Sequence, residues 1–191
     1  MKNFTSNIKE YIEKEIVILK NLDTDVINNI MNAILDAHDK SATIYIFGNG
    51  GSASTASHFV NDFNKGISEY IDKKFNFICL NDNVPTMMAI ANDLGYEKIF
   101  SFQLSNKLKP DDLVIGISGS GNSPNVLNAI EYAKSCNIKT IGITGYDGGK
   151  LAKTVDISFN VNINDMQITE DVHMILDHLM MSVFMKMMIK Q

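Results

Sequence analysis

TIYIFGNGGS, residues 43–52, joins an apolar run of β-branched and aromatic residues to a loop rich in glycine. Such a run is typical of a buried strand. Glycines let the backbone approach a ligand closely, and a helix that starts here offers free N–H groups and the positive end of its dipole. The stretch therefore predicts a strand, an anion-binding loop and a helix. A plain tight turn between strand and helix explains the glycines equally well at this point.

The composition of the chain is that of an ordinary globular domain. Of its 191 residues, 45% are hydrophobic and 20% are charged, which is enough for one full core. A net charge of -5 argues against a general nucleic-acid partner. No apolar run is long enough to cross a membrane, and the N-terminus lacks the apolar core of a signal peptide, so we expect a cytoplasmic protein. Cys79 and Cys136 have no metal-type spacing and predict no disulfide framework.

Residues 3–38 predict two helices ahead of the first strand. Apolar side chains recur at helical spacing from Phe4 to Leu19 and again from Val26 to Leu35. We expect this pair, within residues 1–40, to pack on the domain or against a partner subunit.

Downstream, strands alternate with helices. Apolar runs at residues 75–80, 113–117, 139–144 and 155–159 predict four more strands. Helical patterns occupy residues 52–65, 86–94 and 124–135, and a long C-terminal helix is expected over about 168–189. This alternation predicts an α/β fold: a three-layer α/β/α sandwich with a five-stranded parallel sheet, formed by residues 1–191 as a single domain. In such folds ligands bind beyond the carboxyl ends of the strands.

A second loop, SGSGNS at residues 118–123, follows the strand at 113–117 and precedes a helix. Hydroxyls and backbone N–H groups in such a loop form a neutral cradle that suits a phosphate. The chain has no Gly-Lys-Ser/Thr sequence after either loop, which argues against a P-loop. Two such loops at neighbouring strand ends favour one phosphate-binding mouth over two unrelated turns.

Three further groups of polar residues are candidates for chemistry. His58 and Asp62 lie four residues apart, on one face of the predicted helix, where they can bind a metal, share a proton or simply face solvent. Glu170 and His178 lie two turns apart on the last helix, so a metal or acid–base partnership is possible there, and a first-turn acid with a core histidine is the alternative. Asn92-Asp93 can cap a helix or contact sugar hydroxyls.

Five segments of the chain together resemble the SIS (sugar isomerase) domain family, and within it the phosphoheptose isomerase branch; they are residues 48–52, 58–59, 92–93, 116–123 and 144–149. The similarity covers about residues 3–189. It implies a flavodoxin-like SIS fold and a homotetramer with sites at subunit interfaces. It also implies an aldose–ketose isomerase that converts sedoheptulose 7-phosphate to D-glycero-D-manno-heptose 7-phosphate through an enediol, in the biosynthesis of nucleotide-activated heptose and surface polysaccharide.

The resemblance also implies roles for individual residues. The proton transfer is assigned to Asp62 and His178, in an order that the sequence leaves open. Zinc, one ion per site, is assigned to His58, Asp62, Glu170 and His178. The expected substrate-binding residues are Asn49, Gly50, Gly51, Ser52, Asp62, Asn92, Asp93, Ser118, Gly119, Ser120, Ser123 and Glu170, with the four serines at the phosphate.

The chain departs from the family pattern at three positions. Asp62 stands where a glutamate is usual, Glu170 where a glutamine is usual, and Gly119 in the middle of a usual Ser-Thr-Ser. A carboxylate binds Zn²⁺ more readily than an amide does, so Glu170 favours a metal site. Two other functions stay open: a non-catalytic SIS module that binds a phosphosugar or serves as a protein scaffold, and an isomerase of another sugar phosphate.

Overall fold

The structure, a computed structural model, describes residues 2–189, so Met1 and residues 190–191 of the expected domain lie outside the described residues. Its centre is a parallel sheet with the strand order β2-β1-β3-β4-β5. The strands are β1 (Ile44–Gly48), β2 (Phe77–Cys79), β3 (Leu113–Ser118), β4 (Lys139–Gly145) and β5 (Ile157–Val161). The predicted five-stranded parallel sheet is confirmed. Because the chain leaves β1 toward β2 and then crosses back to β3, the carboxyl ends of β1 and β3 flank the switch point where ligands bind in such sheets.

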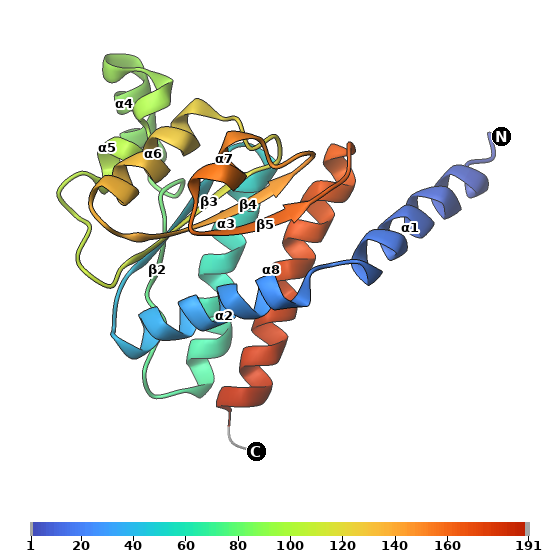
Figure 1. Ribbon diagram of the computed structural model, residues 1–191, viewed down its shortest axis with the longest axis horizontal. Coiled ribbons are helices and arrows are strands. Elements are labelled where there is room, and N and C mark those ends of the chain that lie inside the picture. The colour runs from blue at the N-terminus through green and yellow to red at the C-terminus, as the bar shows by residue number, and fades with distance from the viewer. Residues whose placement is uncertain (1, 190–191) are drawn as a thin grey trace.

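Helices cover both faces of the sheet, which confirms the three-layer sandwich (Figure 1). One face carries α2 (Thr24–Asp39), α3 (Gly51–Asn61) and α8 (Met166–Met188), and the other carries α4 (Val84–Leu94), α5 (Ser101–Leu104), α6 (Pro124–Ser135) and α7 (Gly149–Thr154). Alternate residues of β1 supply the two cores: Ile44 and Ile46 belong to the first buried cluster, Tyr45 and Phe47 to the second. This follows from the alternation of side chains along a strand.

Two short departures from the expected elements lie next to the site. The helical segment after the first loop is α3 followed by a π-helix, η1 (Asp62–Ile67), and a 3-10 turn, η2 (Ser68–Tyr70). π-helical turns are rare and frequently occur at functional sites. The strand expected at 75–80 is limited to β2, where the Asn64 side chain bonds both the N–H and the carbonyl of Phe77. A second 3-10 turn, η3 (Tyr96–Lys98), follows α4.

Helix α1 (Thr5–Lys20) extends away from the rest of the molecule (Figure 1). It has no buried residue. It contacts the start of α8, where the Tyr11 hydroxyl donates to Asp171 and the Lys14 ammonium lies 3.4 Å from an Asp165 carboxylate oxygen. Packing on the domain is therefore slight, and packing against a partner subunit stays a prediction.

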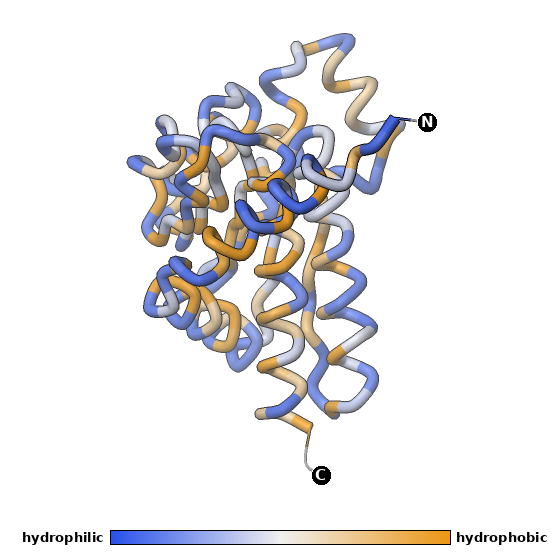
Figure 2. Tube along the Cα trace, turned by 90° about the vertical axis from the view of Figure 1, so that its right-hand side faces the viewer, coloured by the Kyte–Doolittle hydropathy of each residue, from blue (hydrophilic) through white to orange (hydrophobic). Residues whose placement is uncertain are grey.

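No helix within residues 2–189 has the length and apolar character that crossing a membrane requires. Helix α8, which leads to the C-terminus, alternates between hydrophobic and hydrophilic segments (Figure 2).

Candidate active site and metal centre

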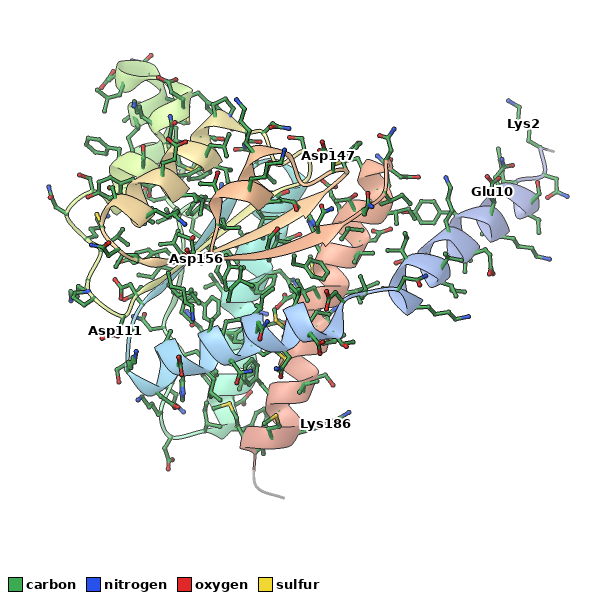
Figure 3. All side chains as sticks on the ribbon, viewed as in Figure 1. Lys2, Glu10, Asp111, Asp147, Asp156 and Lys186 are labelled. Carbon is green, nitrogen blue, oxygen red and sulfur yellow. The ribbon has the colours of Figure 1, made fainter. Side chains whose placement is uncertain are left out.

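The two glycine- and serine-containing loops meet at the carboxyl edge of the sheet, as the sequence predicts. Figure 3 marks both edges: Asp111 and Asp156 precede β3 and β5, whereas Asp147 follows β4 on the opposite side. Here a cavity of about 170 Å³ is lined by Asn49, Ser52, Ser118, Gly119, Ser120, Ser123, Met166 and Glu170. The hydroxyl oxygens of Ser118 and Ser123 lie 3.0 Å apart. The cavity thus gathers hydroxyl groups beside the first turn of α3, an arrangement that binds anions.

Glycines shape the first loop for two reasons, backbone conformation at Gly50 and lack of space at Gly51. Gly50 has a positive φ of 54°, a conformation that glycine adopts without strain. A Cβ atom on Gly51 would lie 2.3 Å from a carboxylate oxygen of Glu170. The Glu170 side chain therefore lies directly against the first residue of α3, at the positive end of that helix dipole.

Among the side chains that line this cavity, Glu170 carries the one formal charge. The cavity holds no lysine or arginine, so a phosphate there is bound by hydroxyls, N–H groups and helix dipoles. The carboxylate opposes a phosphate dianion in the same space. Glu170 must turn away, or be neutralised, when an anion binds.

Asn49 is held in place by two residues that the sequence patterns did not single out. Its Nδ2 donates to Asn125 Oδ1 at 2.9 Å, and its Oδ1 accepts from Asn125 Nδ2 at 2.8 Å and from the Tyr96 hydroxyl at 3.0 Å. Asn125 is 1% exposed. A buried amide with both groups bonded fixes the orientation of the loop. Its one sequence signal is a polar residue in the first turn of the helix that starts at Pro124.

A second group of polar side chains lies between α3 and α8. His58, Asp62, Asp177 and His178 place one ligand atom each within 4.8 Å of the others. The two Nε2 atoms of the histidines lie 3.0 Å apart, and Asp62 Oδ2 lies 3.6 Å from the Nε2 of His58 and 3.9 Å from that of His178. Asp62 Oδ1 accepts from Asn61 Nδ2 at 3.0 Å, so Oδ2 is left facing the histidines. This group can bind a metal ion.

Asp177 is the residue of this group that the sequence reasoning missed. It is fully buried, and neither carboxylate oxygen has a hydrogen-bond partner among the described residues. Burial, reinforced by the charge of Asp62, raises the pKa of Asp177 to about 8. Its sequence signal was a lone acid in an apolar turn, directly before a histidine.

The two histidines of α8 have opposite environments. His178 is exposed, so the interpretation of it as a core residue is wrong. His173 is the buried one: its Nε2 lies 3.0 Å from the Thr144 carbonyl oxygen and therefore donates to it. Burial lowers the pKa of His173 to about 4, which keeps the imidazole neutral at pH 7.

Glu170, Asn92 and Asp93 do not belong to the metal-binding group. Glu170 lines the serine cavity. Asn92 and Asp93 are exposed at the end of α4, where Asn92 Nδ2 donates to Asp93 Oδ1 at 2.7 Å and the Gly95 N–H bonds the Ile90 carbonyl. Their positions fit the end of a helix, and their contact with sugar hydroxyls stays a prediction.

Known proteins share both the sequence pattern and the fold. The chain matches the SIS domain model over residues 5–145. It is 34% identical over 177 residues to a probable phosphoheptose isomerase of Thermoplasma volcanium, covering 93% of this chain and 90% of that protein. It is also 34% identical to the phosphoheptose isomerase of Helicobacter pylori, covering 90% of each. The structure of the phosphoheptose isomerase GmhA of Neisseria gonorrhoeae superposes with a TM-score of 0.87 at 26% identity, over 95% of this chain and 98% of that one. The chain therefore belongs to the SIS domain family, in its phosphoheptose isomerase branch.

Proposed function

We propose that this protein is an aldose–ketose isomerase that converts sedoheptulose 7-phosphate to D-glycero-D-manno-heptose 7-phosphate. Relatives that align over nine tenths of the chain are named phosphoheptose isomerases. The observation that carries the proposal is that α8 joins the serine cavity, at Glu170, to a group of histidines and carboxylates, at His178. Eight residues of helix span about 12 Å, which suits a long sugar phosphate bound at both ends.

The phosphate is bound at the serine cavity. The hydroxyls of Ser52, Ser118, Ser120 and Ser123 are proposed to donate to its oxygens. Asn49 and Gly119 line the same cavity, and Gly50 and Gly51 are proposed to border the bound group. Here the helix α3 adds its free N–H groups and its dipole. Binding energy at this remote group orients the reacting carbons at the other end.

Asp62 and His178 exchange the protons of the reaction. One of them, as base, removes a proton from C1 of the ketose, and the resulting enediol receives a proton at C2 as the hydroxyl proton moves from O1 to O2. Asp62 Oδ2 and His178 Nε2 lie 3.9 Å apart, so both reach neighbouring carbons. Asn92 and Asp93 are proposed to contact the sugar hydroxyls.

We further propose that one zinc ion per site is held by His58, Asp62 and His178. Imidazole and carboxylate donors suit Zn²⁺, and the spacing of these side chains fits a common ion. Zinc supplies polarisation of the carbonyl and hydroxyl oxygens. Glu170, the fourth ligand implied by resemblance, lies in the serine cavity and would have to turn away from Gly51.

A homotetramer with sites at subunit interfaces belongs to the same proposal, as does a cytoplasmic location. Exposed apolar residues of α1 support an oligomer: Ile8 is 57% and Ile12 50% exposed, and a row of such side chains is typical of an interface. The proposed role in the biosynthesis of nucleotide-activated heptose and surface polysaccharide is based on the resemblance to the family alone.

The proposal predicts that His178→Gln and Asp62→Asn each lower kcat by about 100-fold or more, since each removes a general acid–base group. Conversion of sedoheptulose 7-phosphate is followed by NMR in D₂O, where the aldose product carries solvent deuterium at C2. Two variants that both retain near-full activity would contradict the assignment.

The same NMR measurement on a panel of ketose phosphates separates the alternatives. If the protein converts another sugar phosphate and not sedoheptulose 7-phosphate, it is an isomerase of that other sugar phosphate. Phosphosugar binding without any turnover favours a non-catalytic binding module.

A further inference from the structure

Two carboxylates and two imidazoles converge between α3 and α8, and one of the carboxylates has no protein partner. Asp177 is fully buried, with both oxygens unbonded among the described residues. A buried polar group without a partner is costly, and such groups in native structures call for an explanation. One carboxylate oxygen of Asp177 lies within 4.8 Å of the ligand atoms of His58, Asp62 and His178. A cation bound among these atoms would remove the free-energy cost of burying the Asp177 carboxylate without a partner.

The charges of the group fit a divalent cation. With an ion bound, the two carboxylates of Asp62 and Asp177 would supply two negative charges, and the imidazoles of His58 and His178 would complete a set of four donors. Nitrogen and carboxylate donors in this number are typical of zinc sites. Without an ion, a second negative charge beside Asp62 is unfavourable in this mostly buried space.

Glu170 is engaged elsewhere. Its carboxylate lines the serine cavity and lies against Gly51, at the positive end of α3. Asp177 lies nearly two turns further along the same helix, next to His178, and reaches the group from the α8 side. Asp62, with its short side chain, approaches from the α3 side.

We propose that Asp177, rather than Glu170, is the second carboxylate ligand of the metal centre. This assignment rests on the zinc site of the proposed function and changes its ligand set to His58, Asp62, Asp177 and His178. Glu170 is thereby left to act in the anion cavity alone.

The test measures zinc binding directly, in the full chain freed of metal. Dissociation constants for Zn²⁺ are determined by competition with a chromogenic chelator, and the visible spectrum of the Co²⁺-substituted protein reports the ligand set. Asp177→Asn is expected to weaken Zn²⁺ binding at least about tenfold and to change the Co²⁺ bands. Glu170→Gln, the matched control on the same helix, is expected to leave affinity within about twofold and the Co²⁺ bands unchanged.

Folding of the variants is checked by thermal denaturation without metal. Asparagine has the shape of aspartate and cannot ionise, so Asp177→Asn is expected to be at least as stable as the metal-free wild type. Asp177→Leu is a second variant, expected to lose zinc affinity in the same way. If both Asp177 variants bind zinc like the wild type, or if Glu170→Gln is the one that loses affinity, the assignment is overturned.

An isomerase assay on the same preparations separates this inference from the proposed function. Zinc binding that depends on Asp177, without turnover of sedoheptulose 7-phosphate, would overturn the function and leave the ligand set standing. Turnover by a wild-type protein that binds no zinc would overturn the ligand set and leave the isomerase standing.

Discussion

At the scale of single residues, two acids of α8 differ in what surrounds them. Glu170 is partly exposed and lies at the N-terminus of α3, where the helix dipole stabilises its charge. Asp177 is fully buried beside Asp62, where nothing in the described chain bonds it. The resemblance to the family assigned the metal to Glu170. The structure places Glu170 in the lining of the serine cavity and Asp177 in the group with His58, Asp62 and His178.

Glu170→Gln is expected to tighten binding of inorganic phosphate by about three- to tenfold, because it removes the one negative charge that lines the cavity. Isothermal titration calorimetry at low ionic strength measures the change. Glu131→Gln, an exposed charge on α6, is the control and is expected to bind phosphate like the wild type. Unchanged or weaker binding by Glu170→Gln would show that its carboxylate does not oppose the anion.

At the scale of elements, α8 determines the geometry of the site. Its first turns line the serine cavity, and its fourth turn supplies Asp177 and His178. Between them, His173 attaches the helix to β4 through the Thr144 carbonyl. The π-helix η1 begins at Asp62, so the turn from His58 to Asp62 keeps the expected spacing while the backbone beyond it changes.

His173 predicts a loss of stability in acid. Its folded pKa, about 4, lies below the ordinary value of about 6.5, so the unfolded chain takes up a proton first as the pH falls. The contribution of His173 to the free energy of unfolding is fully present above pH 6.5 and is lost as the pH falls toward 4. The loss amounts to about 3 kcal/mol. Urea denaturation of the metal-free protein measures it.

His173→Gln is the comparison, because glutamine keeps an N–H for the Thr144 carbonyl and does not titrate. The wild type is expected to lose about 3 kcal/mol more than this variant between pH 7 and pH 4. Subtracting the loss of the variant from that of the wild type cancels the contribution of Asp177, which both proteins share. The raised pKa of Asp177 acts in the opposite direction: it stabilises the folded protein at low pH, and this stabilisation is lost as the pH rises toward 8. Equal losses in the two proteins would mean that His173 titrates normally.

At the scale of the whole molecule, the single chain leaves two regions uncovered. One is the apolar row Phe4, Ile8, Ile12 and Ile16 along α1, spaced four residues apart. The other is the edge of the metal-binding group, where the side chain of His178 is 55% exposed. Proton transfer through an enediol needs a site that excludes water. A partner subunit over these regions would provide it.

The double variant Ile8→Glu with Ile12→Glu is expected to dissociate the oligomer, because it places charges in the apolar row of α1. Sedimentation velocity measures the size of the particle, and circular dichroism checks the fold. Ser6→Glu with Asn7→Glu adds the same charge to other faces of α1 and is expected to leave the oligomer intact. A wild-type protein that sediments as a monomer would remove the interface proposal.

Much of the fold was predictable because its signals are local. Near-continuous apolar runs separated by helical patterns determine a parallel sheet, and glycines and serines at strand ends mark where a ligand binds. The start of β5 was misjudged by two residues, since Val155 and Asp156 belong to the turn before the strand. Helices α5 and α7, of 4 and 6 residues, are too short to show a helical period of apolar residues.

The sequence by itself determined the α/β fold, the meeting of the two loops, and the pairing of His58 with Asp62, because each depends on spacing within one element or on the common direction of parallel strands. Only the tertiary structure decided which acids of α8 reach which partner. Residues of one helix share an axis but face different neighbours, and those neighbours come from α3, η1 and β4. For that reason His173 is buried, Glu170 lies in the anion cavity, and Asp177 completes the group at His178.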